Sequence, residues 1–433
     1  MVKIKTHPIL SKYENIGMHN QLPIIWKKAK GCYVYDNKNK KILDFTSTIF
    51  VTNIGHGNKR LIKYIKSVLD KPILHTYNYA NNYRLKYVKH LVKFSGKNFG
   101  KVFLLSGGSE TTEAALKLMR LYAIKKKKRK PGIISLLGNW HGRTMGSQLM
   151  CGNYEQKKWM GFRDSNIHHL KFPYPWTLKN NDPKIFFENS LKKLKKKINF
   201  KKDICGFILE TFQGWGALFY PKKYISAVSK FCKLNDILLT FDEMQSGFGR
   251  TGKKFGYEHY NVKPDIICCG KGMGSGFPLS GLIAKQKIID LGAPGSMSST
   301  HSANPLACAA GLATIEEINR KKLVFKSHIN GIYLHKGLKH IKNKFPDFIY
   351  SIEGKGLIAA IIFKKNIKLK NINTGTKLAD KICIDALKNK LLLVRTGRES
   401  IKIGPPLIIS RKEIKDGLII LSKTIQSIVN KNS

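Results

Sequence analysis

Lys271 is the residue of this 433-residue sequence whose setting best suits nucleophilic chemistry. It follows the apolar run Ile266–Cys269 and lies between Gly270 and Gly272. A lysine that leaves a buried strand is partly desolvated, which lowers its pKa and makes its amine a nucleophile toward carbonyl groups. The surroundings are similar to a phosphate loop, but the GxxxxGK[ST] order is absent because Gly272 follows the lysine directly.

An acidic residue lies at the end of a second apolar run, Ile237–Phe241. Asp242 would stand at the carboxyl end of a buried strand, where ligands bind in α/β sheets. A buried carboxylate is costly unless a cation pairs with it. That cation is either a buried arginine or the protonated ring nitrogen of a ligand, and the sequence alone leaves both open. The nearby stretch Gly247–Gly252 matches GxGxxG, but it opens no apolar helix, so we interpret it as a structural loop.

A glycine-rich stretch, Ser106–Glu113, joins a candidate strand to a candidate helix. Gly108 and Ser109 there would offer backbone N–H groups and a hydroxyl to an anion such as phosphate. An ordinary helix cap, with Glu110 near the positive end of the helix dipole, explains the same residues equally well. A second hydroxyl cluster, Ser298–Ser302, ends before another helix and allows the same two interpretations.

The segment Asn139–Thr144 also follows a candidate strand. Its Trp140 ring, beside a glycine, would cover one face of a flat cofactor, and the guanidinium of Arg143 would hold a carboxylate through two hydrogen bonds. A packed tryptophan with a surface arginine is the simpler interpretation when the segment is taken alone. The cofactor-binding interpretation of this segment becomes stronger only when the other sites are considered with it.

The candidate site residues can meet only in a fold that brings the ends of their strands together. Short apolar runs alternate with amphipathic stretches, and such unbroken runs suit a mostly parallel sheet that is covered on both faces. The candidate strands are Val102–Leu105, Ile133–Leu137, Gly206–Leu209, Ile237–Phe241 and Ile266–Cys269, and the candidate helices include Glu110–Ala123 and Tyr224–Leu234.

The outer segments differ from this pattern. Cys32–Tyr35 and Ile42–Phe45 predict a hairpin around a polar turn, and the last hundred residues mix helices with short strands. We therefore expect a large domain at residues 56–305. A small domain would combine an N-terminal segment, residues 1–55, with residues 306–433.

Lysine and arginine outnumber aspartate and glutamate by 78 to 27, so the formal net charge is +51. A polyanion binder would carry such a charge. We favour a lysine-rich composition instead, because lysines occur along the whole chain. The two densest runs, Lys125–Lys130 and Lys192–Lys202, do not alternate with aromatic residues as stacking platforms do. No specific nucleic-acid partner is expected.

The eight cysteines include no CxxC pair and mostly have apolar neighbours, which predicts buried free thiols and neither disulfides nor a metal site. The N-terminus has no apolar core of a signal peptide, and no run approaches the roughly 20 apolar residues that span a bilayer. We expect a cytoplasmic protein without a membrane partner.

In this order and spacing the sites closely resemble the class III aminotransferases, which are fold-type I pyridoxal-phosphate (PLP) enzymes, and within them the 4-aminobutyrate and acetylornithine type. The resemblance runs from about Gly31 to Leu407. Lys271 lies 29 residues after Asp242 and 29 residues before Thr300, which is consistent with the family. The resemblance implies an α/β fold with a mostly parallel, seven-stranded type of sheet, PLP as cofactor, and a homodimer with shared active sites.

The resemblance also implies a role for each site residue. Lys271 would bind PLP as a Schiff base and shuttle a proton, and Asp242 would pair with the ring nitrogen. The implied cofactor contacts come from Gly108, Ser109, Trp140, His141, Glu210, Gln245 and Thr300, the last toward the neighbouring subunit. The implied substrate contacts come from Phe50, Arg143, Trp215, Arg398 and Lys402.

Two residues depart from the family pattern. Trp215 replaces the second glutamate of the stretch that begins at Glu210, and Lys402 replaces an arginine. In the members that use glutamate these two residues form a switch that admits the α-carboxylate. A lysine is a point charge and not a fork, which argues against glutamate as amino donor unless Arg398 compensates. Trp215 suggests a bulkier or less charged substrate.

The resemblance thus implies an aminotransferase that moves an amino group between small amine and carbonyl substrates by a ping-pong mechanism. An amino-acid epimerase or aminomutase of the same fold is the alternative, because the cofactor motifs do not decide which bond breaks. A basic nucleic-acid-binding protein is a remote alternative, since no binding module is found.

Overall fold

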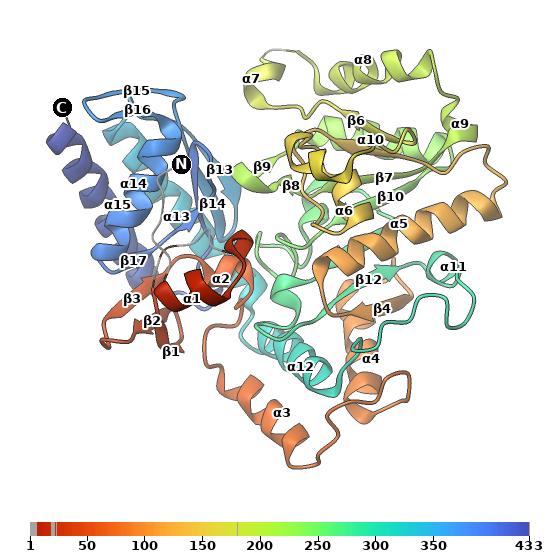
Figure 1. Cartoon of the computed structure of the whole chain (residues 1–433), viewed down its shortest axis with the longest axis horizontal. Coiled ribbons are helices and arrows are strands. Elements are labelled where there is room, and N and C mark those ends of the chain that lie inside the picture. Colours follow the sequence, from red (N-terminus) through yellow and green to blue (C-terminus); the bar gives the residue numbers. More distant parts are fainter. Residues whose placement is uncertain (1–6, 19–21, 23, 180, 433) are drawn as a thin grey trace. The chain divides into compact units, whose positions relative to one another are not determined.

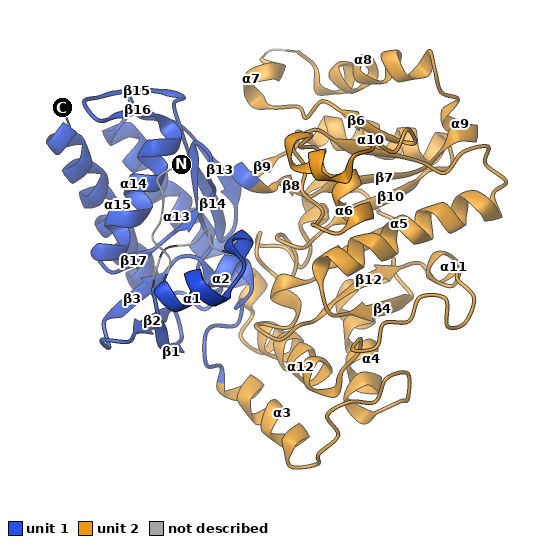
Figure 2. Ribbon diagram, viewed as in Figure 1, with its two compact units in different colours: residues 1–58, 215–217, 325–433 blue, residues 59–214, 218–324 orange. Residues whose placement is uncertain are grey.

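The computed structural model describes residues 7–18, 22, 24–179 and 181–432, and these divide into two compact units (Figure 2). The small unit comprises the described residues of 1–58, 215–217 and 325–433, and the large unit comprises those of 59–214 and 218–324. The second boundary falls after Val324 and not after residue 305. The reason is that helix α12 (Pro305–Arg320) packs against α3 (Lys59–Leu69) and α4 (Asn82–Ser95) of the large unit.

A seven-stranded sheet forms the centre of the large unit (Figure 1). Its order is β4-β12-β11-β10-β7-β5-β6, and β12 runs antiparallel to both of its neighbours. The strands are β4 (Lys101–Leu105), β5 (Gly132–Leu136), β6 (Ile167–Leu170), β7 (Ile204–Glu210), β10 (Leu238–Asp242), β11 (Ile266–Cys269) and β12 (Ser280–Ala284). Strands β5, β7, β10 and β11 are buried along their whole length, which explains their unbroken apolar runs. The predicted mostly parallel sheet is confirmed.

Helices pack closely on this sheet. Helix α5 (Gly108–Lys125) contacts β7, β11 and β12, and its buried apolar side chains belong to a hydrophobic core cluster that includes residues of these strands. A Cβ added at Gly206 of β7 would lie 2.1 Å from Met119 Sδ of α5, so only glycine fits there. Helix α10 (Lys222–Leu234) packs on β10 and on α8 (Pro183–Lys195). Shorter helices are α6 (Met145–Met150), α7 (Pro175–Leu178), α9 (Phe200–Asp203) and α11 (Gln286–Ile289).

The small unit contains two four-stranded sheets, with orders β1-β2-β3-β17 and β13-β14-β19-β18. Strands β2 and β3 form the predicted antiparallel hairpin. The strands are β1 (Trp26–Lys30), β2 (Tyr33–Asp36), β3 (Lys41–Asp44), β13 (Ile349–Lys355), β14 (Ile358–Phe363), β17 (Leu391–Leu392), β18 (Val394–Arg395) and β19 (Ser400–Ile403). The longer helices are α13 (Leu323–Lys344), α14 (Gly375–Lys388) and α15 (Arg411–Asn432). Both ends of the chain therefore build this unit.

A left-handed turn occupies the short element α2 (Ser47–Phe50) of the small unit. Its four residues have φ angles between 47° and 69°, in a region that costs a non-glycine residue about 1–2 kcal/mol. The hydroxyl of the first residue donates to the Gly404 carbonyl at 2.5 Å, and just before the turn the Asp44 carboxylate lies 2.7 Å from His56 Nε2. A Cβ added at Gly404 would come within 2.3 Å of the Phe50 ring. These contacts fix the position of that ring.

All eight cysteines are buried free thiols, as predicted. Among the described residues, no helix combines the length and apolar character that crossing a bilayer requires. The same residues contain no group of histidine, cysteine and acidic side chains that is arranged to hold a metal ion.

Candidate active site

The carboxyl ends of neighbouring parallel strands collect the residues that we expect to do chemistry. Asp242 ends β10, Glu210 ends the adjacent strand β7, and His141 lies in the loop after β5. Lys271 follows β11 and begins a short 3-10 helix, Lys271–Met273. Residues distant in the sequence thereby reach one edge of the sheet, where ligands of α/β proteins bind.

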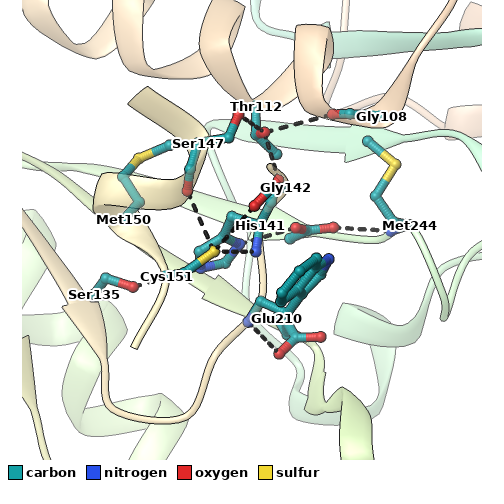
Figure 3. Close-up of polar contacts among 12 residues, drawn as sticks. Gly108, Thr112, Ser135, His141, Gly142, Ser147, Met150, Cys151, Glu210 and Met244 are labelled. Atoms are coloured by element: carbon teal, nitrogen blue, oxygen red, sulfur yellow. Dashed lines mark hydrogen bonds and ion pairs between the residues drawn. The ribbon is translucent and has the colours of Figure 1, made fainter. Parts of the chain in front are cut away.

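The Asp242 carboxylate is buried and held from two sides, by the residues His141 and Met244 that Figure 3 labels. Its Oδ2 lies 2.9 Å from His141 Nδ1, and its Oδ1 accepts the backbone N–H of Met244 at 3.0 Å. His141 is also buried, with Nε2 3.4 Å from Ser135 Oγ and its backbone N–H 3.1 Å from Cys151 Sγ. These contacts fix the orientation of the carboxylate at the end of the strand.

Lys271 adopts a left-handed conformation, with a φ of 32°. Burial lowers the pKa of its amine below the ordinary value of 10.5, while the carboxylates of Asp242 and Glu210 act in the opposite direction. Burial is the larger effect, so the neutral nucleophilic amine forms at a lower pH than in a surface lysine.

The Glu210 carboxylate organises the loops beside it. Its Oε2 accepts the backbone N–H of Trp140 at 3.0 Å, and its Oε1 lies 3.5 Å from the Gln245 amide nitrogen. A Cβ added at Gly214 would lie 2.5 Å from that nitrogen and 2.8 Å from Glu210 Oε1. The glycine therefore keeps the space in which these two side chains meet.

The start of α5 contains a helix cap made by Glu110 and, next to it, the hydroxyl of Ser109, which lies close to the loop at Gly142. The Glu110 carboxylate accepts the backbone N–H groups of Ser106 and Gly107, which confirms the capping interpretation for these residues. Ser109 Oγ accepts the backbone N–H of Arg143 at 3.2 Å, and a Cβ added at Gly142 would lie 2.4 Å from this oxygen. A phosphate contact by Gly108 and Ser109 stays a prediction.

Three predicted ligands of the large unit are more open to solvent. The exposed Arg143 places its guanidinium 4.7 Å from the centre of the half-buried Trp140 ring. Thr300 is exposed, and its carbonyl oxygen lies 2.8 Å from His75 Nε2. The ring of Trp140 thus already has one cationic neighbour within its own chain.

The remaining predicted substrate residues belong to the small unit and form two cation–aromatic pairs. Lys402 Nζ lies 4.7 Å from the centre of the Phe50 ring, and both residues are buried. The Arg398 guanidinium lies 3.7 Å from the centre of the Trp215 ring. Ser400 Oγ donates to the Trp215 carbonyl at 2.9 Å, which ties residues 215–217 to strand β19. The two departures from the family pattern therefore belong to the same unit.

Sequence reasoning missed Met244 as a structural link in this region. Cβ atoms added at Gly108 and Gly270 would lie 3.1 Å and 2.6 Å from Met244 Sδ, so one side chain packs under both glycine loops. Its position two residues after Asp242 was the available signal. Cys151 was seen only as a buried thiol, yet it contacts His141, and burial raises its pKa to about 11.

A lysine of lowered pKa, a buried acid and a glycine-rich helix start on one edge of a mostly parallel seven-stranded sheet define the class of fold-type I PLP-dependent transferases. The sequence model of the family described as "Aminotransferase class-III" matches residues 16–425, so the chain belongs to that family. It is therefore a transaminase, which moves an amino group between an amino donor and a carbonyl acceptor.

Its relatives agree with this assignment. The chain is 33% identical to acetylornithine aminotransferase of Prochlorococcus marinus over 96% of this chain and 94% of that one. It is 32% identical to the acetylornithine/succinyldiaminopimelate aminotransferase of Buchnera aphidicola, over 93% and 92% of the two chains. Among solved structures, a Bacillus anthracis aminotransferase is 26% identical with a TM-score of 0.86 over 97% of this chain and 98% of that one. A transaminase from the marine bacterium Virgibacillus is 25% identical with a TM-score of 0.87 over 98% of both chains.

Proposed function

We propose that this class III aminotransferase binds PLP covalently through Lys271 and uses a primary amine as donor and a small carbonyl compound as acceptor. The observation that carries the proposal is the buried Asp242 carboxylate, held by His141 and Met244 on the same sheet edge as a lysine of lowered pKa. When bound there, PLP supplies an electron sink that stabilises negative charge on the substrate carbon.

The residues at this edge suit the parts of that cofactor. Asp242 would keep the ring nitrogen protonated, because a fixed anion there stabilises the N–H⁺ form. Gln245 would bond the phenolic oxygen and Trp140 would cover one face of the ring. Gly108 and Ser109 would bind the phosphate, which the positive end of the α5 dipole attracts.

Lys271 is proposed to act as the base of the reaction. Its neutral amine accepts the proton of the carbon that carries the amino group, and its lowered pKa makes this form available. The nearby carboxylates of Asp242 and Glu210 stabilise the ammonium form that results. The same nitrogen can then return the proton, so one residue serves both directions of transfer.

The small-unit residues Phe50, Trp215, Arg398 and Lys402, with Arg143, are proposed to contact the substrate. Lys402 is a single point charge over a ring, where an arginine would offer two parallel hydrogen bonds to a carboxylate. Trp215 adds bulk where the family has an acid. We therefore propose that the preferred substrate is bulkier or less charged than glutamate, and acetylornithine, named in the relatives, is the first donor to test.

Reduction with borohydride tests the covalent attachment. Purified protein loaded with PLP should absorb as a protonated imine, and borohydride should leave a reduced pyridoxyl group on Lys271, found by peptide mass. The same loaded protein, mixed with a panel of amines, should change its absorbance only with true donors. A colourless protein with no trapped lysine refutes the cofactor assignment, and efficient turnover of 2-oxoglutarate refutes the substrate proposal.

We also propose a homodimer in which Thr300 reaches the phosphate of the neighbouring subunit. The family resemblance and the exposure of Thr300 support this role. Sedimentation velocity should give a particle of about twice the 49.1 kDa chain mass. A monomer that transaminates at full rate would refute shared sites.

A further inference from the structure

The two densest lysine runs of the sequence lie side by side in the large unit. All six residues of Lys125–Lys130 are basic, and seven of the eleven residues 192–202 are lysines. The Lys128 ammonium donates to the Lys201 carbonyl at 2.9 Å, and the backbone N–H of Arg129 donates to the Lys202 carbonyl at 2.7 Å. The end of α5 and the helix α9 therefore meet, as Figure 1 shows at the right of the molecule.

This cluster lies at the amino ends of the sheet strands. Residues 125–130 lead into β5, residues 192–202 lead into β7, and residues 233–236 at the end of α10 lead into β10. Asp242 ends β10 and Lys271 follows β11, so the proposed catalytic residues lie at the carboxyl ends of the parallel strands, at the opposite edge of the sheet. A partner that contacts residues 125–130, 192–202 and 233–236, which we call the basic face, would leave the catalytic edge open.

Few acidic side chains balance the basic face. Asp203 is bound by Arg129, with Nε donating to Oδ1 at 2.6 Å, and Asp236 lies 3.3 Å from Lys126 Nζ. Most of the lysines are exposed, including Lys125, Lys127, Lys195, Lys196 and Lys197. The face therefore presents a concentrated positive charge to its surroundings.

Two large aliphatic side chains project at this face: Ile124 is 74% exposed and Leu234 is 69% exposed. Aliphatic groups among lysines suit a lipid surface, whose headgroups attract the charges while the side chains enter the apolar boundary. A nucleic acid would be recognised through stacked aromatics or arginine forks. Here Phe200 and Phe231 pack on each other with ring centres 5.0 Å apart, and Arg129 already binds a carboxylate.

We propose that the basic face binds reversibly to membranes that contain anionic lipids. Crossing a bilayer needs a long apolar segment, whereas this association needs only surface charge and shallow apolar side chains. Each lysine near an anionic surface strengthens binding by about fivefold, and the attraction decays over about 10 Å at 0.1 M salt. Transamination does not depend on it.

Cosedimentation with vesicles tests the proposal on the full-length, PLP-loaded enzyme. Vesicles of phosphatidylcholine mixed with phosphatidylglycerol should pellet the enzyme at about 0.1 M salt and release it at about 1 M salt, and pure phosphatidylcholine should not pellet it. Absence of pelleting with the anionic vesicles at the lower salt would overturn the proposal.

Matched variants separate the basic face from the overall charge. The variant with Lys125→Gln, Lys127→Gln, Lys195→Gln and Lys196→Gln should bind anionic vesicles at least about tenfold more weakly. The control removes the same charge from exposed positions of the small unit, namely Lys336→Gln, Lys339→Gln, Lys344→Gln and Lys415→Gln, and should bind within about twofold of the parent. Both should keep the parental transaminase rate. Equal losses of vesicle binding in the two variants would show that only net charge matters, and would refute the basic face as the binding site.

A third variant distinguishes lipid from nucleic acid. Ile124→Ser with Leu234→Ser should weaken vesicle binding several-fold while salt sensitivity persists, because the apolar contacts are lost and the charges remain. If this variant binds vesicles as the parent does, and single-stranded RNA competes better than the vesicles, the partner is a nucleic acid and the lipid proposal is wrong.

Discussion

The two clusters of charged residues differ in how their charges are held. In the large unit, Asp242 and Glu210 accept directional hydrogen bonds of 2.9–3.0 Å from defined donors. In the small unit, the Lys402 ammonium lies over the Phe50 ring and the Arg398 guanidinium over the Trp215 ring, and Arg398 also lies 3.5 Å from Glu399 Oε1. Both departures from the family pattern belong to the second cluster. The difference is that directional hydrogen bonds hold the candidate acids, whereas the cations proposed to contact the substrate pack against aromatic rings.

The largest effect is expected from Lys271→Ala. In the proposed mechanism this amine is both the covalent link to the cofactor and the base, so transamination should fall by at least about 10⁴-fold. Steady-state assays measure this loss, with exposed Lys287→Ala as the matched control at parental rate. Comparable activity in the two variants would remove Lys271 from the mechanism.

Asp242→Asn should have the next largest effect. The side chain keeps its size but loses the charge that is proposed to hold the ring nitrogen protonated, so kcat should fall about 10²–10³-fold while the melting temperature changes little. Asp265→Asn is the control, because Asp265 pairs with Lys285 before β11, at the opposite end of the strands. A parental kcat for Asp242→Asn would contradict the proposed role of the Asp242 carboxylate.

His141→Asn should reduce kcat by about 10- to 100-fold, which is the worth of one hydrogen bond to a charged group. KM should change little, because the histidine acts through Asp242 and does not meet the substrate. In the double variant with Asp242→Asn the two losses should not add, since both act through one contact. Full additivity would place His141 outside this network.

In the small unit, Trp215→Glu combined with Lys402→Arg restores the family pattern. An arginine fork can bind a carboxylate through two hydrogen bonds, so kcat/KM for 2-oxoglutarate should rise about tenfold relative to the parent. The exchange Lys364→Arg, at an exposed position of the same unit, should change nothing. An unchanged preference would mean that this cluster does not set specificity.

The smallest effect is a shift in titration. In cofactor-free protein, Lys271 should become half-reactive toward an acylating reagent at a pH below 10.5, because burial lowers its pKa. Asp242 raises that pKa, so Asp242→Asn should move the midpoint further down. Labelling at a series of pH values, followed by peptide mass analysis, measures both midpoints. A midpoint that does not fall in the variant would mean that Asp242 does not raise the pKa of Lys271.

In the seven-stranded sheet, five strands with apolar runs were predicted within one or two residues of their bounds, and β6 and β12 were missed. β6 carries His168 and His169 at the edge of the sheet, where polar side chains are tolerated. β12 begins with serine and glycine, which are poor strand signals, although its neighbours bury it fully. Neighbouring elements therefore determine that these two segments form strands, and the local sequence pattern carries no information about those neighbours.

The candidate site shows the same limit. Asp242 and Lys271 could be placed from the sequence because each follows a buried strand. The contact between His141 and Asp242 joins residues 101 positions apart, and no local signal indicates which histidine meets which acid. The grouping of Trp215 with the small unit depends equally on long-range contacts, such as the bond from Ser400.

The left-handed turn at Ser47–Phe50 is unfavourable by itself, so it depends on contacts with other parts of the small unit. Four such residues in succession raise the local free energy by several kcal/mol, on the order of the stability of a whole domain. The contact with Gly404 and the neighbouring Asp44–His56 pair help to hold the turn against this cost. This stretch should consequently fold late and open early. Opening of the turn would therefore be an early sign that the small unit is destabilised.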